Sequence, residues 1–546
     1  MKSSENRVNR INFLVFIFTV LLVSPGLIKG QASQGFFLND WAPRTVVIPK
    51  FTDVVKPSGY DVTVTVNAAD TVAKVSPYIF GNNANIWSTI MYNNPELVKH
   101  LKDLNPHVLR YPGGNLSNDF FWDLKPGERP EDIPQDIKIR VGNNPATSTM
   151  SVDNYYKFLK TVGATGIICV NYAYARYGLS SDPVVRAAHY AAEWVRYDNG
   201  RTKFWEIGNE NYGKWEDGFT IDTTVNKDGQ PHIINGRLYG SHCRVFIDSM
   251  KAAASEKGHT IYIGVVAWKS ATSSDPVEAR WNQLMIPEVA DKTDFYIVHD
   301  YYTKYQENSD AQTILNTYKK SEEFKASVFD ALKNAGYGPA PIALTEWNIF
   351  AVGSQQQVSQ ISGIHATLVL GELIKGQYGL AARWDLANGW NKGNDHGMFS
   401  EGGEPGVDRF APRPVFYYMT FFQRYFGDVM IKSIGSGNDD IISYASRFSN
   451  GPMGLVVVNK GDQEHNVKID MVNFDPGSRY YWYTLEGGKL NGQFSRQVVI
   501  NGFVPGRVAG GPLDYDRIKA YSATTEGGIV VDAKPYTVQY ILVDGQ

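Results

Sequence analysis

Two glutamates stand where an apolar run of the sequence gives way to polar residues. The first run reads Lys203-Phe-Trp-Glu-Ile-Gly-Asn-Glu210 and the second reads Pro341-Ile-Ala-Leu-Thr-Glu346. Two carboxyl groups in different environments can share a substitution reaction, because one donates a proton while the other faces the reacting carbon as an anion. Cleavage of a glycosidic bond requires this chemistry. Glu210 and Glu346 are therefore the candidate catalytic residues.

Such a pair works only if the fold brings the ends of the two runs together. Between residues 76 and 410, eight short β-like runs alternate with amphipathic helical stretches, which predicts an α/β fold, the (β/α)8 TIM barrel. Glu210 ends the fourth run and Glu346 the seventh, so both would lie at the barrel mouth, at the separation of roughly 5 Å that accompanies retention of configuration. The eight runs are 78–82, 107–111, 166–171, 203–208, 261–267, 295–299, 341–346 and 380–385.

The flanking segments predict two further parts. Strand-like runs separated by Gly, Asn, Asp and Pro turns predict an appended all-β sandwich at 411–546. Residues 31–75 contain an alternating run at 60–66, which we expect to join that sandwich. Within residues 1–30, basic residues precede about a dozen apolar ones, a pattern typical of a secretory signal peptide. We therefore expect a secreted or periplasmic protein that does not contact the membrane once the signal is removed. A retained membrane anchor is the alternative.

Composition narrows the possible partners. The net charge of −3 gives no reason to expect nucleic acid or an anionic membrane as a partner. The two cysteines, Cys169 and Cys243, have no zinc-site spacing, and Cys169 lies in an apolar run where a free thiol acts as a small hydrophobe. Acidic clusters lack calcium-loop spacing. We therefore expect neither a metal nor a cofactor, and the sequence gives no indication of an oligomeric state.

An ordered set of motifs resembles glycoside hydrolase clan A, and within it family 51, which contains α-L-arabinofuranosidases and some endoglucanases. Asn-Glu ends the fourth predicted strand and Glu the seventh, as in the clan. Three segments are similar to family 51 elements of the second, fourth and sixth strands, in that order: Leu109-Arg-Tyr-Pro-Gly-Gly-Asn115, Trp205-Glu-Ile-Gly-Asn-Glu210 and Val298-His-Asp-Tyr301. The resemblance covers the barrel and implies the same barrel-plus-sandwich fold. Thr345 departs from the family, which often has an acidic residue before the nucleophile.

The resemblance implies a role for each glutamate and for its neighbours. Glu210 would be the general acid/base and Glu346 the nucleophile, with Asn209 hydrogen-bonded to the sugar 2-hydroxyl. Arg110 would keep Glu346 ionised, unless it forms a structural salt bridge instead. Tyr301 would orient the nucleophile, although Tyr302 beside it leaves the register open. His299 either tunes the pair or lies in the barrel wall.

Other polar and aromatic residues at predicted strand ends are candidates for the sugar pocket. Indole faces stack on sugars, so either Trp384 or Trp390 could form a platform from the eighth strand. Glu206 precedes Glu210 by four residues and lies deeper in the barrel, where a buried structural carboxylate is expected. The pocket candidates are Asn115, Asn171, Trp347, Trp384 and Trp390.

The leading functional prediction is a secreted, retaining glycoside hydrolase that acts on plant or algal polysaccharide or its oligosaccharides. Its substrate could be that of an exo-acting α-L-arabinofuranosidase or of an endo-acting glycanase of endoglucanase or xylanase type. A catalytically silent glycan-binding protein is the alternative from another class, because fold alone does not determine activity. The intact set Arg110, Asn209, Glu210, Tyr301 and Glu346 favours an enzyme.

Overall fold

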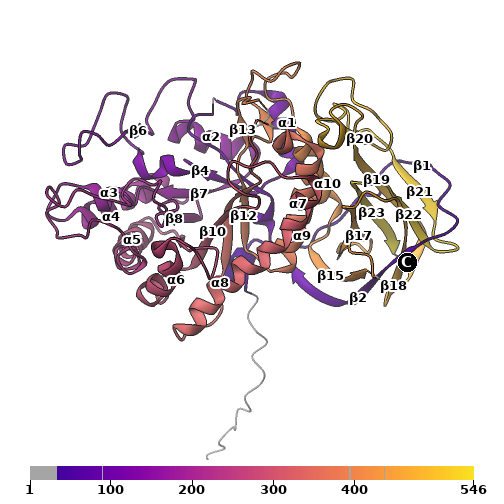
Figure 1. Ribbon diagram of the computed structural model, residues 1–546, viewed down its shortest axis with the longest axis horizontal. Helices are drawn as coiled ribbons and strands as arrows, with labels where there is room; N and C mark the ends of the chain where they lie inside the picture. Colours follow the sequence, from indigo (N-terminus) through magenta and orange to yellow (C-terminus); the bar gives the residue numbers. More distant parts are fainter. Residues whose placement is uncertain (1–32, 89, 354, 393–394, 436, 546) are drawn as a thin grey trace, which may run out of the picture.

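The computed structural model describes residues 33–545 except 89, 354, 393–394 and 436, so the predicted signal peptide lies outside the described residues. Eight parallel strands close into a barrel in sequence order (Figure 1), and each predicted run supplies one of them. The predicted barrel is thereby confirmed. The strands are β3 (Gly81–Asn83), β4 (Val108–Tyr111), β7 (Thr165–Val170), β8 (Phe204–Ile207), β9 (Tyr262–Val266), β10 (Phe295–Tyr301), β11 (Ile342–Asn348) and β12 (Leu380–Arg383).

Helices surround the barrel, and polar caps fix where several of them begin. The side chains of Asn94, Ser151, Asn235, Asp275 and Asp310 each accept a hydrogen bond from a backbone N–H of the first turn that follows. The helices are α1 (Pro95–Leu104), α2 (Val152–Val162), α3 (Tyr174–Tyr177), α4 (Pro183–Asp198), α5 (Gly236–Glu256), α6 (Pro276–Val289), α7 (Ala311–Asn316), α8 (Lys320–Asn334), α9 (Gln360–Lys375) and α10 (Pro414–Tyr425). Among the described residues, none of these helices is both long and apolar enough to cross a membrane.

Aromatic side chains close one end of the barrel. Phe37, from the 3₁₀ turn η1 (Gly35–Leu38), packs against Phe204 and Phe295 with ring centroids 5.0 Å and 5.3 Å away. Both partners are the first residues of their strands, so this plug lies at the amino ends of β8 and β10. The polar residues that follow the strands lie at the opposite end. Because the N-terminal segment closes this end of the barrel, a substrate can enter at the mouth, the opposite end.

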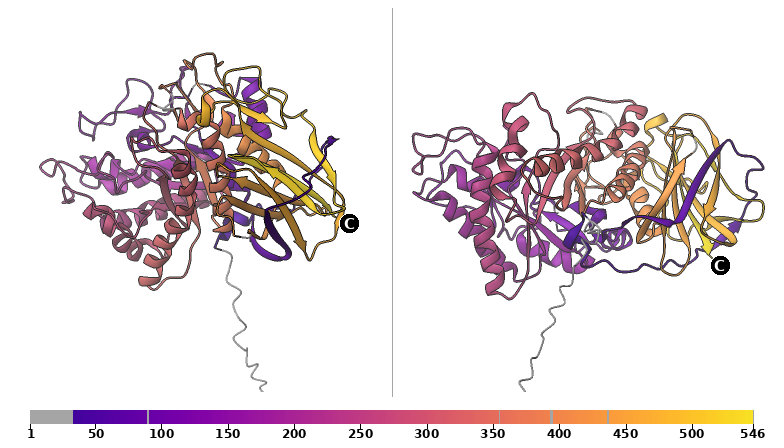
Figure 2. Two further views of the ribbon diagram at one scale, coloured as in Figure 1. Left: turned by 45° about the vertical axis from the view of Figure 1, so that its right-hand side comes forward. Right: turned by 90° about the horizontal axis from the view of Figure 1, so that it is seen from below.

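An eleven-stranded sheet forms the second part of the molecule, beside the barrel in all views (Figures 1 and 2). β2 (Val62–Lys74) lies inside this sheet, antiparallel to β15 (Val429–Gly435) and parallel to β18 (His465–Val472), so the N-terminal segment contributes a strand to it. The remaining strands are β1 (Phe51–Asp53), β16 (Ile441–Arg447), β17 (Met453–Asn459), β19 (Pro476–Gly487), β20 (Val498–Ile500), β21 (Ala520–Thr524), β22 (Ile529–Ala533) and β23 (Thr537–Gly545).

Alternate side chains along the sheet strands face two different hydrophobic cores. Val457 and Ile541 belong to a core enclosed by the sheet itself, whereas Val458 and Tyr540 belong to the cluster that continues into the barrel domain. The Tyr540 hydroxyl donates to the Tyr418 carbonyl of α10 at 2.8 Å and lies 3.1 Å from the Thr367 hydroxyl of α9. The sheet is therefore packed against the barrel through α9 and α10.

The boundary predicted at residue 410 precedes a helix rather than a strand. α10 packs against α9 and α1, and the sheet begins again only at β15. Its sequence, Pro414-Val-Phe-Tyr-Tyr-Met-Thr-Phe-Phe-Gln-Arg-Tyr425, is rich in aromatic and β-branched residues that favour strands. Burial on nearly every side explains the helix, because tertiary packing overrides such preferences.

Candidate active site

The chain turns sharply where Glu210 leaves the barrel wall. Gly208 has φ of 75°, and a Cβ there would lie 2.1 Å from the Asn211 Oδ1 atom, so this position requires glycine. Glu210 itself has φ of 43°, a left-handed conformation that is uncommon outside glycine. The turn places the Glu210 side chain over the mouth after β8 ends.

Glu346 reaches the same mouth through an irregularity in β11. The pairing of β10 with β11 shifts between Val298 and His299, so that His299 pairs with Glu346 and Thr345 is left over. One extra residue in a strand re-aims the side chains that follow it. The Thr345 hydroxyl lies 2.9 Å from His299 Nε2, so the bulge also anchors the histidine ring.

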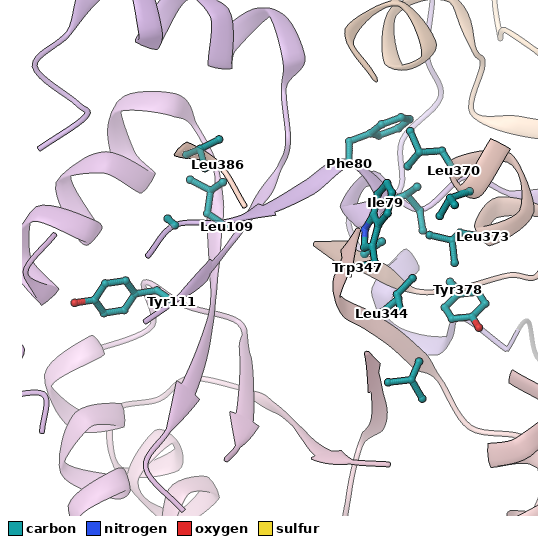
Figure 3. Packing of buried hydrophobic residues seen from close by; sticks show 14 of the residues in the cluster. Ile79, Phe80, Leu109, Tyr111, Leu344, Trp347, Leu370, Leu373, Tyr378 and Leu386 are labelled. Atoms are coloured by element: carbon teal, nitrogen blue, oxygen red, sulfur yellow. The ribbon is translucent and has the colours of Figure 1, made fainter. Parts of the chain in front are cut away.

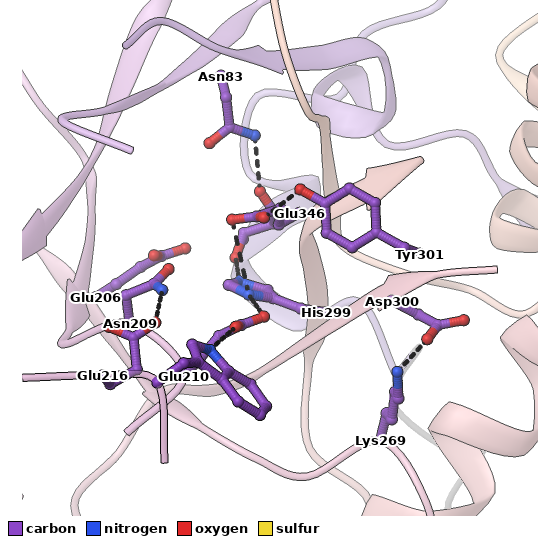
Figure 4. A network of polar contacts seen from close by, with 12 residues as sticks. Asn83, Glu206, Asn209, Glu210, Glu216, Lys269, His299, Asp300, Tyr301 and Glu346 are labelled. Atoms are coloured by element: carbon purple, nitrogen blue, oxygen red, sulfur yellow. Dashed lines mark hydrogen bonds and ion pairs between the residues drawn. The ribbon is translucent and has the colours of Figure 1, made fainter. Parts of the chain in front are cut away.

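The two carboxylates share His299 (Figure 4). Its Nδ1 atom lies 3.0 Å from Glu210 Oε1 and 3.9 Å from Glu346 Oε2, so these two oxygens are within about 7 Å of each other. Retaining glycosidases hold such a pair roughly 5–5.5 Å apart, and inverting ones roughly 6.5–9.5 Å. The upper limit includes the retaining separation and overlaps only the lower end of the inverting range, and His299 is in direct contact with the site.

Each carboxylate has its own set of donors. Glu346 accepts from the Tyr301 hydroxyl at 2.5 Å and from Arg110 Nη1 at 3.3 Å. Glu210 accepts from the indole N–H of Trp215 at 2.9 Å. Tyr301 rather than Tyr302 therefore contacts Glu346, while the Tyr302 hydroxyl lies 2.6 Å from the Ser321 hydroxyl.

Burial and neighbouring charges set the proton affinities of the pair. Burial raises the pKa of Glu210, but the hydrogen bond and positive charge of His299, with smaller help from Trp215 and Lys269, bring it below its ordinary value. Burial raises the pKa of Glu346 above its ordinary value, and the charge of Glu210 adds to this effect. His299 and Arg110 oppose the increase at Glu346. The charge on His299 thus lowers the pKa of both carboxyls.

Replacing His299 by asparagine tests this coupling through the pH profile. Asparagine keeps an N–H donor but cannot carry a positive charge, so the pKa values of Glu210 and Glu346 should both rise. Because the acidic limb reports the first ionisation of the pair and the alkaline limb the second, both limbs of kcat/KM against pH should move to higher pH. Limbs that stay in place in His299→Asn would show that His299 carries no charge in the free protein.

Arg110 connects the residues beneath Glu210 and Glu346. Its guanidinium is fully buried and donates to Glu206 at 2.8 Å, to Asn83 Oδ1 at 3.0 Å and to Asn209 Oδ1 at 2.8 Å, besides its contact with Glu346. Both interpretations of Arg110 therefore hold together, since it forms a structural ion pair and also contacts the predicted nucleophile. Glu206 is fully buried against Arg110, as expected of a structural carboxylate.

Four residues of the network were not singled out from the sequence. Asn83 ends β3 and could have been found from its strand-end position. Trp215 and Glu216 lie in the loop after Glu210, and Asn118 lies in the 3₁₀ turn η3 (Asn115–Asp119) that follows β4. A charged loop residue is ordinarily solvated, so nothing local in the sequence marks Glu216 as buried. Its pKa lies well above the usual range because of burial and the charge of Glu210.

Two of the predicted pocket residues lie at the mouth. Trp384 directly follows β12 and is 8% exposed, and its ring lies against the backbone of Gly113 and Gly114, where a Cβ on Gly114 would be 2.7 Å from the indole. Bulkier residues could not take the place of Gly114 without moving this ring. Asn115 follows these glycines and is exposed at the start of η3.

Three other predicted pocket residues occupy different surroundings. Trp347 was predicted wrongly, because it is fully buried among Ile79, Leu344 and Leu373 on the outer face of β11 (Figure 3). Successive residues of a strand point to opposite faces, so Trp347 cannot share the inward direction of Glu346. Asn171 directly follows β7, and its side chain is occupied by protein partners. Its amide donates to the Tyr177 hydroxyl and accepts from the Tyr174 N–H, which fixes the start of α3.

Trp390 is also separated from the catalytic network. The Arg496 guanidinium, which comes from the sheet domain, lies 5.4 Å from its ring centroid. Arg496 in turn pairs with the buried Glu404 at 2.8 Å. Trp390 therefore packs at the junction of the two domains.

The two cysteines are free thiols in the protein interior. Cys169 and Cys243 are buried and unpaired, in agreement with the expected free thiol. Within the part of the chain that the structure describes, no group of three or more His, Cys, Asp and Glu side chains is placed to hold a metal ion.

Comparisons with known proteins support the resemblance. A model of the family described as "Alpha-L-arabinofuranosidase 1 domain" matches residues 100–322. An intracellular exo-α-(1→5)-L-arabinofuranosidase of Bifidobacterium longum is 25% identical over 324 residues, which are 53% of this chain and 53% of that protein. The α-L-arabinofuranosidase C of Emericella nidulans is 25% identical over 170 residues, 27% of this chain and 33% of that protein. The chain thus spans about half or less of the length of these relatives.

Solved structures share the whole fold. A thermostable GH51 α-L-arabinofuranosidase from Thermotoga petrophila has a TM-score of 0.64 at 19% identity, over 89% of this chain and all of that one. CelM2, a bifunctional glucanase-xylanase from a metagenome library, has a TM-score of 0.57 at 14% identity, over 90% of this chain and all of that one. The similarity to clan A and to family 51, and the barrel-plus-sandwich fold, are therefore confirmed.

Proposed function

We propose that this chain is a retaining glycoside hydrolase in which Glu210 is the general acid/base and Glu346 the nucleophile. One observation carries the proposal: the buried carboxylate of Glu346 in β11 and the part-buried carboxylate of Glu210 after β8 meet at His299 and have different donors. Arg110 and Tyr301 contact Glu346 and favour its anionic form, against the burial that raises its pKa. Glu210 faces the more open side, beside the half-exposed Trp215.

The reaction has two displacements. In the first, Glu346 attacks the anomeric carbon while the bond to the leaving oxygen breaks and Glu210 gives that oxygen its proton. In the second, Glu210 takes a proton from water, the water oxygen attacks the same carbon, and the bond to Glu346 breaks. Two inversions at one carbon return its original configuration.

Protonation of Glu210 must precede the first step. In the empty site the pKa of Glu210 is lowered chiefly by the hydrogen bond and the charge of His299. Burial by the protein and by a bound sugar acts in the opposite direction and favours the neutral acid. Covering of Glu210 by the sugar would therefore prepare the site for catalysis.

The proposed substrates are arabinose-containing plant or algal polysaccharides and their oligosaccharides. The activities of the arabinofuranosidase relatives support this class. An endo-acting glycanase is the second candidate, because the structural neighbours include a glucanase-xylanase. Aryl glycosides and polysaccharides, assayed for released aglycone and reducing ends, separate the two. Release from 4-nitrophenyl α-L-arabinofuranoside supports the first, and internal cleavage of glucan or xylan the second. Binding without any cleavage would support a silent glycan-binding protein instead.

Export is a separate proposal. Its support is the basic and then apolar pattern of residues 1–30. The Bifidobacterium longum relative is described as intracellular, so export would distinguish this chain from it. N-terminal sequencing of the protein recovered from the periplasm or the medium should find a start near residue 31. A start at Met1 with the protein retained in the cytoplasm would contradict export.

Trp384 and Trp390 form a matched pair for testing the sugar platform. Trp384→Ala should raise KM by about tenfold, which corresponds to about 1.4 kcal/mol of lost stacking. Trp390→Ala removes an indole of the same size at the domain junction and should change KM by less than about twofold. Michaelis–Menten kinetics on one aryl glycoside measure both. Equal effects of the two variants would argue against Trp384 as the platform.

A further inference from the structure

The buried carboxyl of Glu216 has no part in the two displacements, yet it adjoins them. Glu216 is 5% exposed and follows Glu210 by six residues. Its two oxygens accept from two amides, Asn118 Nδ2 at 2.6 Å and Asn209 Nδ2 at 3.0 Å. Figure 4 shows Glu216 and Asn209 linked beside Glu210. Burial of a carboxyl group is costly unless hydrogen bonds compensate for it, so these two amides are essential partners of Glu216.

The amide of Asn209 is held from both ends. Its Oδ1 atom accepts from Arg110 Nη2 at 2.8 Å, and a guanidinium can only donate. The Nδ2 atom must therefore face the other way, where the Glu216 oxygen accepts from it. This oxygen can accept whether Glu216 is ionised or protonated. One N–H of Asn209 takes part in this bond, and the second N–H remains.

The amide of Asn118 is fixed in the same sense. Its Nδ2 atom donates to the backbone carbonyl of Asn209 at 2.8 Å as well as to Glu216. Its Oδ1 atom accepts from Asn211 Nδ2 at 3.2 Å. Glu216 is thus faced by two N–H donors. A glutamine at this position has one acceptor and one donor, so its NH₂ group would oppose one of the two amides.

We propose that Glu216 is a positioning residue that locks Asn209, so that the second amide N–H of Asn209 faces the sugar 2-hydroxyl beside Glu346. The inference rests on the proposed function, in which Asn209 contacts that hydroxyl. Glu216 itself touches neither the sugar nor the reacting atoms. Contacts to the 2-hydroxyl strengthen in the transition state, so loosening Asn209 acts on kcat more than on KM.

A comparison of substrates with and without the 2-hydroxyl tests this role. Glu216→Gln keeps the size of the side chain and should lower kcat on 4-nitrophenyl α-L-arabinofuranoside by about tenfold or more, with little change in KM. On the 2-deoxy analogue the same variant should match the wild type within about twofold, because the contact that Asn209 makes is already absent. Thermal melting of both proteins checks that the variant is folded.

Glu216→Asp provides a second variant if the glutamine protein does not fold. It keeps the carboxyl group but draws the oxygens back from Asn209, so the same selective loss is expected. Equal fractional losses on both substrates, or no loss on either, would overturn the proposal, because a general structural role does not depend on one hydroxyl. If the wild type cleaves neither substrate nor any glycoside of the panel, the proposed function fails and this inference fails with it.

Discussion

Replacing Glu346 by glutamine is expected to lower kcat by about four orders of magnitude or more on every substrate. An amide of the same size cannot form the glycosyl ester, and it brings no negative charge to the oxocarbenium-like transition state. Because the side chain keeps its volume, the tight packing around it should remain. Steady-state kinetics at the pH optimum, on substrates with good and poor leaving groups, measure the loss.

Two controls separate chemistry from folding in this prediction. Glu372→Gln removes a carboxylate of α9 that accepts from the Tyr444 hydroxyl of the sheet domain and pairs with Lys375, each at 3.1 Å, and it should leave kcat within about twofold. Thermal melts of the two variants should both remain cooperative. Substantial turnover in folded Glu346→Gln would show that another group attacks the sugar.

Replacing Glu210 by alanine is expected to give losses that depend on the leaving group. A dinitrophenolate departs without a proton, so the first step should be nearly preserved for its glycosides, whereas a polysaccharide should lose about two to four orders of magnitude. The second step then becomes slow, because no base activates water. A glycosyl–enzyme intermediate should therefore accumulate as a burst of phenolate.

Azide distinguishes the roles of the two glutamates. In Glu210→Ala it can enter the space left by the carboxylate and attack the intermediate, which should restore turnover and give a glycosyl azide with the configuration of the substrate. In Glu346→Ala azide would attack the substrate directly and give the opposite configuration. Nuclear magnetic resonance of the products reads this difference. Reversed configurations would exchange the proposed roles of Glu210 and Glu346.

Strand-end position in the sequence predicted much of the fold and the site. The eight barrel strands are predicted from apolar runs of strand length, which are local patterns. The polar residues that follow these strands lie at the barrel mouth. Glu210 and Glu346 were found this way, whereas Arg110 and Tyr301 were found from the resemblance to family 51. The same rule failed for Trp347, because it ignores strand alternation: the residue after Glu346 points to the helices.

Long-range packing explains what the sequence could not predict. Glu216 looks like an ordinary charged loop residue, and only contacts with Asn118, almost a hundred positions earlier, reveal its burial. The twelve residues of α10 have a strand-like composition and become a helix because α9, α1 and the sheet surround them. Both outcomes depend on partners that are distant in sequence, which local patterns do not encode.

The covalent intermediate provides the most direct test of the proposed mechanism. Glu210→Ala can be quenched with acid during turnover of 2,4-dinitrophenyl α-L-arabinofuranoside, digested with a protease and mapped by tandem mass spectrometry. We expect a single glycosyl group, attached to Glu346. Attachment to any other residue, or turnover to a product of inverted configuration without a covalent species, would contradict the assignment of Glu346 as the nucleophile.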